Sequence, residues 1–139
     1  MSTNQTVLKS QLFAANMVLE QLRDAISPEF LGLVATTGQS ITIISSSLMI
    51  DTDILAALTA SSFAATKQLT GIMKVSGFTI TLHEGAELNL SIAQVNSEML
   101  LVICFHKSSD IGKIRLISRH AVESLSMIFA SNINLDRAG

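Results

Sequence analysis

The chain has 139 residues, of which 48% are hydrophobic and 14% are charged, and its formal net charge at pH 7 is −2. This length suits one domain with its own core, and the small net charge gives no electrostatic reason to expect nucleic acid or an acidic membrane as partner. Because charged residues usually make up about 25% of a soluble domain, polar surface is scarce, which favours an oligomer that buries apolar surface.

The first third of the chain predicts a helix followed by two strands. Apolar residues at spacings of three and four indicate an amphipathic helix over 7–26. Ser27-Pro28 ends this helix because proline disfavours helical geometry in the residue before it. Two short strands are expected at about 31–36 and 40–45, joined by a turn at Thr37-Gly38-Gln39.

The stretch 51–74 predicts one helix with Asp51 as its N-cap. This helix has two faces that avoid water. We expect the first to cover the core, and it consists of Ile54, Leu55, Leu58, Ala65, Leu69, Ile72 and Met73. The second, nearly opposite, consists of Ala56, Ala60 and Ala64 with Phe63 beside them.

The small-residue face suits close approach by another helix or another protein. Alanine is also the best helix former at exposed positions, and this alternative stays open. A large exposed aromatic residue lowers solubility unless something covers it, so Phe63 favours a contact surface. We therefore predict that a partner binds Ala56, Ala60, Phe63, Ala64 and the bordering Lys67.

The second half of the chain changes to a period of two, which is typical of strands. Residues 78–83 and 87–92 alternate between apolar and polar side chains, and Glu84-Gly85 is the expected hairpin turn between them. Residues 98–106 are apolar on both sides, which predicts a central strand covered on both faces.

A final helix is expected over about 110–131, and residues 132–139 are expected to form a loose tail. The element order is then α-β-β-α-β-β-β-α. Tight hairpins imply an α+β fold, in which a five-stranded, mainly antiparallel sheet lies between helices. We expect a single domain over 1–139, with its core at about 7–131.

The strand that starts at residue 78 is expected to leave one edge open. This edge carries no proline and no inward charge, which are common protections against pairing with another chain. We therefore predict a dimer interface formed by Phe78, Thr79, Ile80, Thr81 and Leu82.

Catalytic and metal-binding patterns are not recognisable. The chain lacks the Gly-x-x-x-x-Gly-Lys-[Ser/Thr] loop of nucleotide-binding enzymes. Cys104 lies in an apolar run where a buried, inert thiol is expected, and Ser109 or Asp110 is expected to cap the last helix. Three histidines lie on different elements without ligand spacing: His83, His106 and His120. We expect no active site, no metal and no cofactor.

Export and membrane signals are also not recognisable. The longest run without polar residues, Met99–Phe105, is far shorter than the roughly 20 residues that cross a bilayer. The start of the chain, residues 1–6, is polar and lacks the pattern of a secretory signal. With a single cysteine, an internal disulfide framework is excluded, and we expect a cytoplasmic protein without membrane insertion.

Four segments occur in a characteristic order: Gly32-Leu-Val-Ala-Thr-Thr-Gly38, Asp53-Ile-Leu-Ala-Ala-Leu58, Met99-Leu-Leu-Val-Ile103 and Asp110-Ile-Gly-Lys-Ile-Arg115. Their order and spacing resemble the roadblock / dynein light chain family, relatives of the longin fold with a roadblock- and profilin-like architecture. The resemblance extends over about residues 7–131.

The resemblance implies a homodimer, or a heterodimer with another roadblock protein, that pairs the third strands and packs the second helices together. In this family the paired helices form a platform for Ras-like small GTPases, and a related bacterial protein stimulates hydrolysis by a gliding-motility and cell-polarity GTPase. We therefore expect a non-enzymatic GTPase regulator. Because Arg115 and Arg119 are expected opposite the platform, activation would reposition the GTPase's own residues. The alternative is an adaptor that only dimerises and leaves nucleotide turnover unchanged.

Overall fold

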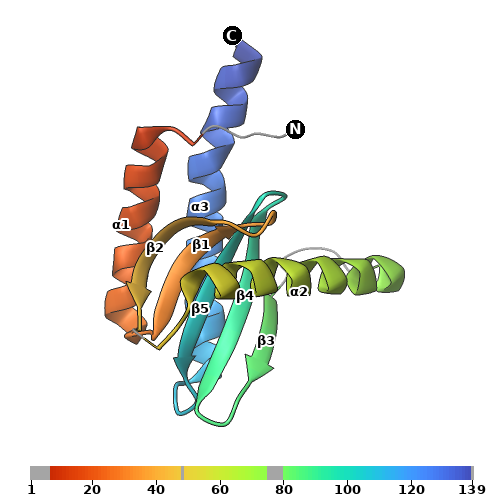
Figure 1. Ribbon diagram of the computed structural model, residues 1–139. Coiled ribbons are helices and arrows are strands. Elements are labelled where there is room, and N and C mark those ends of the chain that lie inside the picture. Colours follow the sequence, from red (N-terminus) through yellow and green to blue (C-terminus); the bar gives the residue numbers. More distant parts are fainter. Residues whose placement is uncertain (1–6, 48, 75–79, 139) are drawn as a thin grey trace.

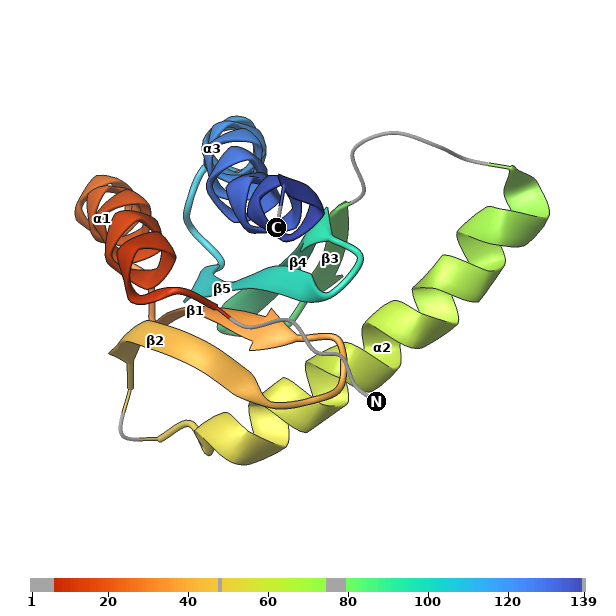
Figure 2. The same ribbon diagram turned by 90° about the horizontal axis from the view of Figure 1, so that it is seen from above.

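The computed structural model describes residues 7–47, 49–74 and 80–138. A five-stranded sheet carries two helices on one face and one helix on the other, as Figure 1 and Figure 2 show. The elements in chain order are α1 (Lys9–Ile26), β1 (Phe30–Ala35), β2 (Ser40–Ser46), α2 (Thr52–Met73), β3 (Ile80–Glu84), β4 (Leu88–Asn96), β5 (Met99–His106) and α3 (Ile111–Ala138). This order confirms the predicted α+β class.

The strand order is β2-β1-β5-β4-β3, and every neighbouring pair is antiparallel. β5 is the central strand, and its residues from Met99 to Phe105 are all buried, as the uninterrupted apolar run predicted. One core lies between the sheet and the α1–α3 layer, and a smaller core lies between the sheet and α2.

The two edge strands differ in regularity. The pairing of β2 with β1 shifts register twice, between Leu31 and Gly32 and between Leu33 and Val34. β3 pairs with β4 in continuous register from Ile80 to Glu84. β2 is therefore a bulged edge and β3 a regular one.

Local hydrogen bonds explain where the helices begin and end. Asp51 caps α2, since its side chain accepts a hydrogen bond from the Ile54 N–H at 3.1 Å, and Asp110 caps α3 by accepting from the Lys113 N–H at 3.3 Å. α1 ends at Ile26, and the following Ser27 has a left-handed backbone with φ of 47°. These observations confirm the predicted caps of both later helices.

The last helix is longer than predicted. α3 continues to Ala138, so the tail expected over 132–139 is wrong for residues 132–138. The segment contains neither glycine nor proline, so no helix-breaking residue interrupts the backbone hydrogen bonds.

Candidate functional site

α2 rests on the sheet with its small residues. Ala56, Thr59, Ala60 and Phe63 are buried, and Ala56 is only 1% exposed. Ala56 and Phe63 belong to the core formed with the sheet. Small side chains let the helix axis approach the strands closely, and Phe63 fills the remaining space.

The two faces of α2 are therefore the reverse of the prediction. Five large residues of the stripe that was expected to cover the core are more than half exposed, and Ile72 reaches 80%: Ile54, Leu58, Leu69, Ile72 and Met73. Of the five residues predicted to bind a partner, Ala56, Ala60 and Phe63 are buried, while Ala64 and Lys67 are exposed. The prediction that Ala56 and Phe63 are free for contact is wrong, because both face the sheet.

A surface hollow lies on one flank of α2, next to the turn between β1 and β2. Its volume is about 340 Å³, and we call it the α2 hollow; it is lined by Thr36, Thr37, Gly38, Ala57, Ala60, Ser61 and Ala64. Every helical residue in the lining is small, so the floor is smooth. Two residues of the predicted contact surface, Ala60 and Ala64, thus line one hollow.

Lys67 lies one turn beyond this hollow. Its ammonium group is 5.9 Å from the ring centroid of Phe63 and 3.5 Å from the side-chain oxygen of Gln94 on β4. The first contact is a cation–π interaction. Both contacts place the positive charge of Lys67 at the border of the sheet.

The C-terminal half of α2 extends past the sheet. Figure 2 shows this part of the helix reaching beyond β3, with no strand above it. We call residues 65–73 the α2 overhang; all of them are exposed except Thr66 and Thr70, which are half-buried. The overhang therefore presents Leu69, Ile72 and Met73 without cover from the described part of the chain.

β3 forms the open edge beside this overhang. Ile80, Thr81 and Leu82 of the predicted dimer interface lie on it and are half-buried. Phe78 and Thr79 lie outside the described residues. β3 also contacts α2, since the His83 ring nitrogen Nε2 lies 3.4 Å from the Ser62 hydroxyl oxygen.

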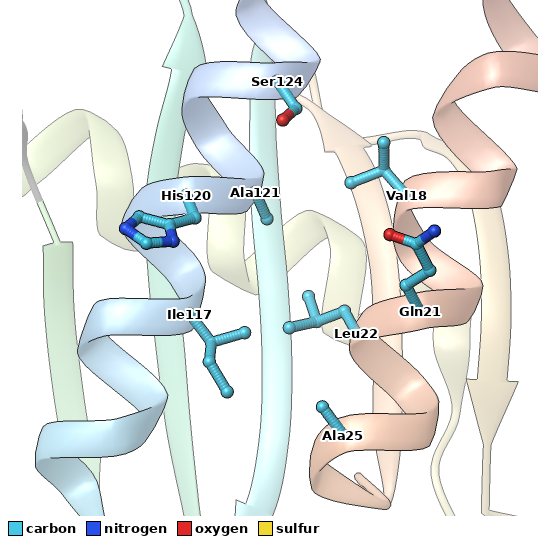
Figure 3. Close-up of a pocket in the computed structure, with 8 residues that line it drawn as sticks. All are labelled: Val18, Gln21, Leu22, Ala25, Ile117, His120, Ala121 and Ser124. Atoms are coloured by element: carbon cyan, nitrogen blue, oxygen red, sulfur yellow. The ribbon is translucent and has the colours of Figure 1, made fainter.

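A second hollow lies on the opposite face, between α1 and α3. It has a volume of about 210 Å³, and Figure 3 shows Leu22 and Val18 of α1 directed toward α3 across it, with Gln21, His120 and Ser124 at its rim. Its remaining lining residues are Ala25, Ile117 and Ala121. The sequence pattern did not indicate this hollow, because it depends on how the two helices are paired.

Two titratable residues lie at the end of β5: Cys104 and His106. His106 is exposed, and its Nδ1 accepts a hydrogen bond from the backbone N–H of Ser108 at 3.1 Å. Burial raises the pKa of the Cys104 thiol, and the charge of Glu29 raises it further, which favours the protonated form of the thiol. Within the described ranges, no three histidine, cysteine, aspartate or glutamate side chains are grouped as metal ligands, and no helix could cross a membrane.

The Roadblock/LC7 domain model matches residues 13–105. The chain belongs to the Roadblock/LC7 family. Among the curated protein sequences, none matches this roadblock protein significantly. The matched residues extend from α1 to β5 and include α2 and the β3 edge, so both candidate surfaces belong to the family domain.

Solved structures agree with this assignment. MglB of Myxococcus xanthus is 30% identical, with a TM-score of 0.82 over 92% of this chain and 96% of that chain. The gliding protein MglB of Thermus thermophilus is 23% identical, with a TM-score of 0.81 over 94% and 99%. A structure described as MglB with tetrameric arrangement is 24% identical, with a TM-score of 0.81 over 95% and 99%. This roadblock protein is thus similar to gliding-motility roadblock proteins over nearly its whole length.

Proposed function

We propose that this roadblock protein is a homodimer that binds a Ras-like small GTPase through α2 and stimulates its GTP hydrolysis. The observation that carries the proposal is the uncovered surface of α2, on a chain 30% identical to MglB of Myxococcus xanthus. A roadblock domain with this similarity is expected to act as a regulator rather than as an enzyme.

The dimer half of the proposal rests on β3 and the α2 overhang. An edge strand in regular register offers unpaired backbone donors and acceptors to a second copy. A two-fold axis beside β3 would pair the two β3 strands and extend the sheet across both copies. Each α2 overhang would then lie under the partner copy's sheet, where Leu69, Ile72 and Met73 would leave water.

The GTPase half rests on the N-terminal part of α2, which the dimer leaves open. Ile54 and Leu58 are exposed there, and the α2 hollow lies on the adjacent flank, with Ala60 and Ala64 in its lining. The small residues that line the hollow leave room for side chains of the partner, because a long side chain there would hold the partner away. Ala56 and Phe63 support this surface from beneath by fixing the helix on the sheet.

The proposed regulation is conformational. Arg23, Arg115 and Arg119 lie on α1 and α3, on the face of the sheet opposite α2. None of these three is placed to enter a nucleotide site docked on α2. We therefore expect the dimer to favour the hydrolysis-competent arrangement of the GTPase's own residues.

The test measures binding and GTP hydrolysis with the Ras-like GTPase from the same genome. Ala64→Arg introduces a long charged side chain into the α2 hollow and should reduce binding at least about tenfold, equivalent to about 1.4 kcal/mol. The matched control is Ala130→Arg, an exposed position on α3 across the sheet, which should bind normally. Unchanged binding by Ala64→Arg would contradict the proposed surface.

The same experiment separates a regulator from an adaptor. If the wild-type dimer binds the GTPase and raises its hydrolysis rate, and Ala64→Arg abolishes both effects, the regulatory function holds. Binding without any change in hydrolysis would favour the adaptor alternative.

A further inference from the structure

One histidine lies where the open edge of the sheet meets α2. His83 is an exposed residue of β3, and its ring nitrogen Nε2 is 3.4 Å from the hydroxyl oxygen of Ser62 on α2. The other two histidines, His106 and His120, lie on β5 and α3. His83 is therefore the histidine at the edge where we expect the second copy to bind.

The pairing of β3 with β4 shows to which face the His83 side chain points. His83 lies opposite Leu90, and residues directly opposite each other in an antiparallel pair point to the same face. Leu90 packs against the core between the sheet and α2. His83 therefore lies on the α2 face of the sheet, and Thr81, two residues earlier, lies on the same face. Leu82 between them packs toward the α1–α3 layer.

The described elements around His83 supply no carboxylate on this face. β4 contains no charged residue, and Glu84, which follows His83 on β3, points to the opposite face because the side chains of a strand alternate. The acidic residue of α2, Asp53, lies in the first turn, more than two turns before Ser62. A neutral imidazole thus has a hydroxyl partner here, whereas a protonated imidazole has no counter-ion.

Two lysines lie at the C-terminal end of α2, on the side of the helix that faces the sheet layer. The Lys67 ammonium is 3.5 Å from the side-chain oxygen of Gln94 on β4. Lys74 follows the end of α2, about two turns after Lys67, and therefore lies on the same side of the helix. In the proposed dimer, the α2 overhang of one copy crosses the β3 edge of the other. These lysines would then approach the face that carries His83 of the partner copy.

We propose that protonation of His83 weakens the β3 dimer, so that the dimer is stable at neutral pH and dissociates in mildly acidic solution. The inference rests on the dimer proposed above. A two-fold axis beside Leu82, the middle residue of β3, sets His83 of one copy opposite Thr81 of the other. The two His83 side chains are then diagonal neighbours on one face, about 7 to 8 Å apart. Two imidazolium ions at this separation repel each other, because salt screens charges fully only beyond a Debye length of about 8 Å.

The direction of the pH effect follows from proton binding. Histidine is the side chain whose charge ordinarily changes between about pH 5 and pH 8. In the dimer, a charged His83 meets the second His83 and the lysines of the partner copy, whereas in the monomer it meets water. The monomer therefore binds the proton more readily than the dimer does, and the dimer affinity falls as the pH falls.

The test is sedimentation equilibrium of the full chain at about pH 7.5 and about pH 5.5, on either side of the histidine range. The wild-type dimer affinity should fall at least about tenfold between the two conditions. His83→Gln keeps a polar group beside Ser62 that does not titrate, so its dimer should be equally stable in both. His83→Lys carries a charge throughout and should dimerise weakly in both. His120→Gln is the matched control, because His120 is an exposed histidine on α3, and this variant should keep the wild-type pH dependence.

The outcomes separate this inference from the dimer on which it rests. A wild-type chain that is monomeric at neutral pH would overturn both. A wild-type dimer with the same affinity in both conditions, or a pH dependence that persists in His83→Gln, would overturn the role of His83 alone. Because His83→Gln is expected to stay dimeric in the acidic condition, it also shows that acid acts on the contact between the copies and not on the fold.

Discussion

β2 and β3 are both edge strands, but they pair with their inner neighbours in different ways. Ile41 and Ile44 have no direct partner in the pairing of β2 with β1, and both side chains pack toward the α1–α3 layer. They are three residues apart, so a regular strand would place them on opposite faces, and the two bulges, one at Ile44 and one at Ile41, let both enter the same core. β3 has no such irregularity.

Because of this difference, we expect the two edges to have different roles. A bulge twists an edge strand and interrupts its row of backbone groups, which discourages pairing with another chain. β2 thus has a protection that β3 lacks, and the α2 overhang lies beside β3. The edge with no protection and an uncovered apolar helix beside it is the one where we expect the second copy.

The largest expected effect comes from protecting β3 artificially. Thr81→Lys places a charge on the open edge, and the two-fold axis brings two such charges together. Dimer affinity should fall about 100-fold, equivalent to about 2.7 kcal/mol. Ser46→Lys makes the matched change on the exposed end of β2 and should leave the dimer mass unchanged in sedimentation equilibrium.

The bulged edge itself depends on Gly32. A Cβ atom at this position would lie 2.8 Å from the backbone oxygen of Thr42, which is too close for any side chain. Gly32→Ala should therefore lower the free energy of unfolding by about 2 kcal/mol, measured by chemical denaturation. Gly71→Ala is the control, because no atom lies within 4 Å of its new Cβ; a similar loss there would contradict the close-approach explanation.

A smaller effect is expected at the start of α2, which crosses beneath the sheet toward the β3 side. Asp51→Ala removes the side-chain acceptor of the Ile54 N–H and should cost about 1 kcal/mol of stability. Asp53→Ala in the same turn removes charge but no cap hydrogen bond, so its cost in thermal unfolding should be smaller. Equal losses would mean that the helix dipole, not the cap, dominates.

The smallest effect is expected at Cys104 on β5, the central strand that lies between the two edges. The raised pKa of Cys104 means that the thiol ionises more readily in the unfolded chain, where its pKa is about 8.5. Its contribution to stability is complete below that pH and is lost as the pH rises toward the folded-state pKa. Wild-type stability should therefore fall relative to Cys104→Ala as the pH rises above about 8.5; parallel pH curves would contradict this.

The sequence predicted the elements well because their periodicities are local. The alternation around Ile80 and Leu82, the apolar run of β5 and the Asp51 cap each depend on a few adjacent residues. The orientation of α2 was not predictable in the same way. A helical wheel assigns the larger apolar face to the core. In the structure the face with Ala56 and Ala60 lies against the sheet instead, because the distance to which a helix can approach depends on the layer on which it packs.

The candidate surfaces were predicted only in part for the same reason. Ala60, Ala64 and Lys67 lie at or next to the α2 hollow, but the hollow also needs Thr36 to Gly38 from a distant turn. The bulges of β2 are likewise a property of pairing, and nothing in the spacing of Ile41 and Ile44 alone indicates them. A surface formed by two segments that are distant in the sequence can be predicted only when the fold is known.

Hydrogen–deuterium exchange at several protein concentrations tests the central claim most directly, because it reports on the β3 edge and the β2 edge separately. The backbone amides of β3, residues 80–84, should exchange more slowly as concentration rises, while those of β2, residues 40–46, should not change. Thr81→Lys should remove the concentration dependence at β3. Protection that rises at β2 instead, or at neither edge, would contradict the account.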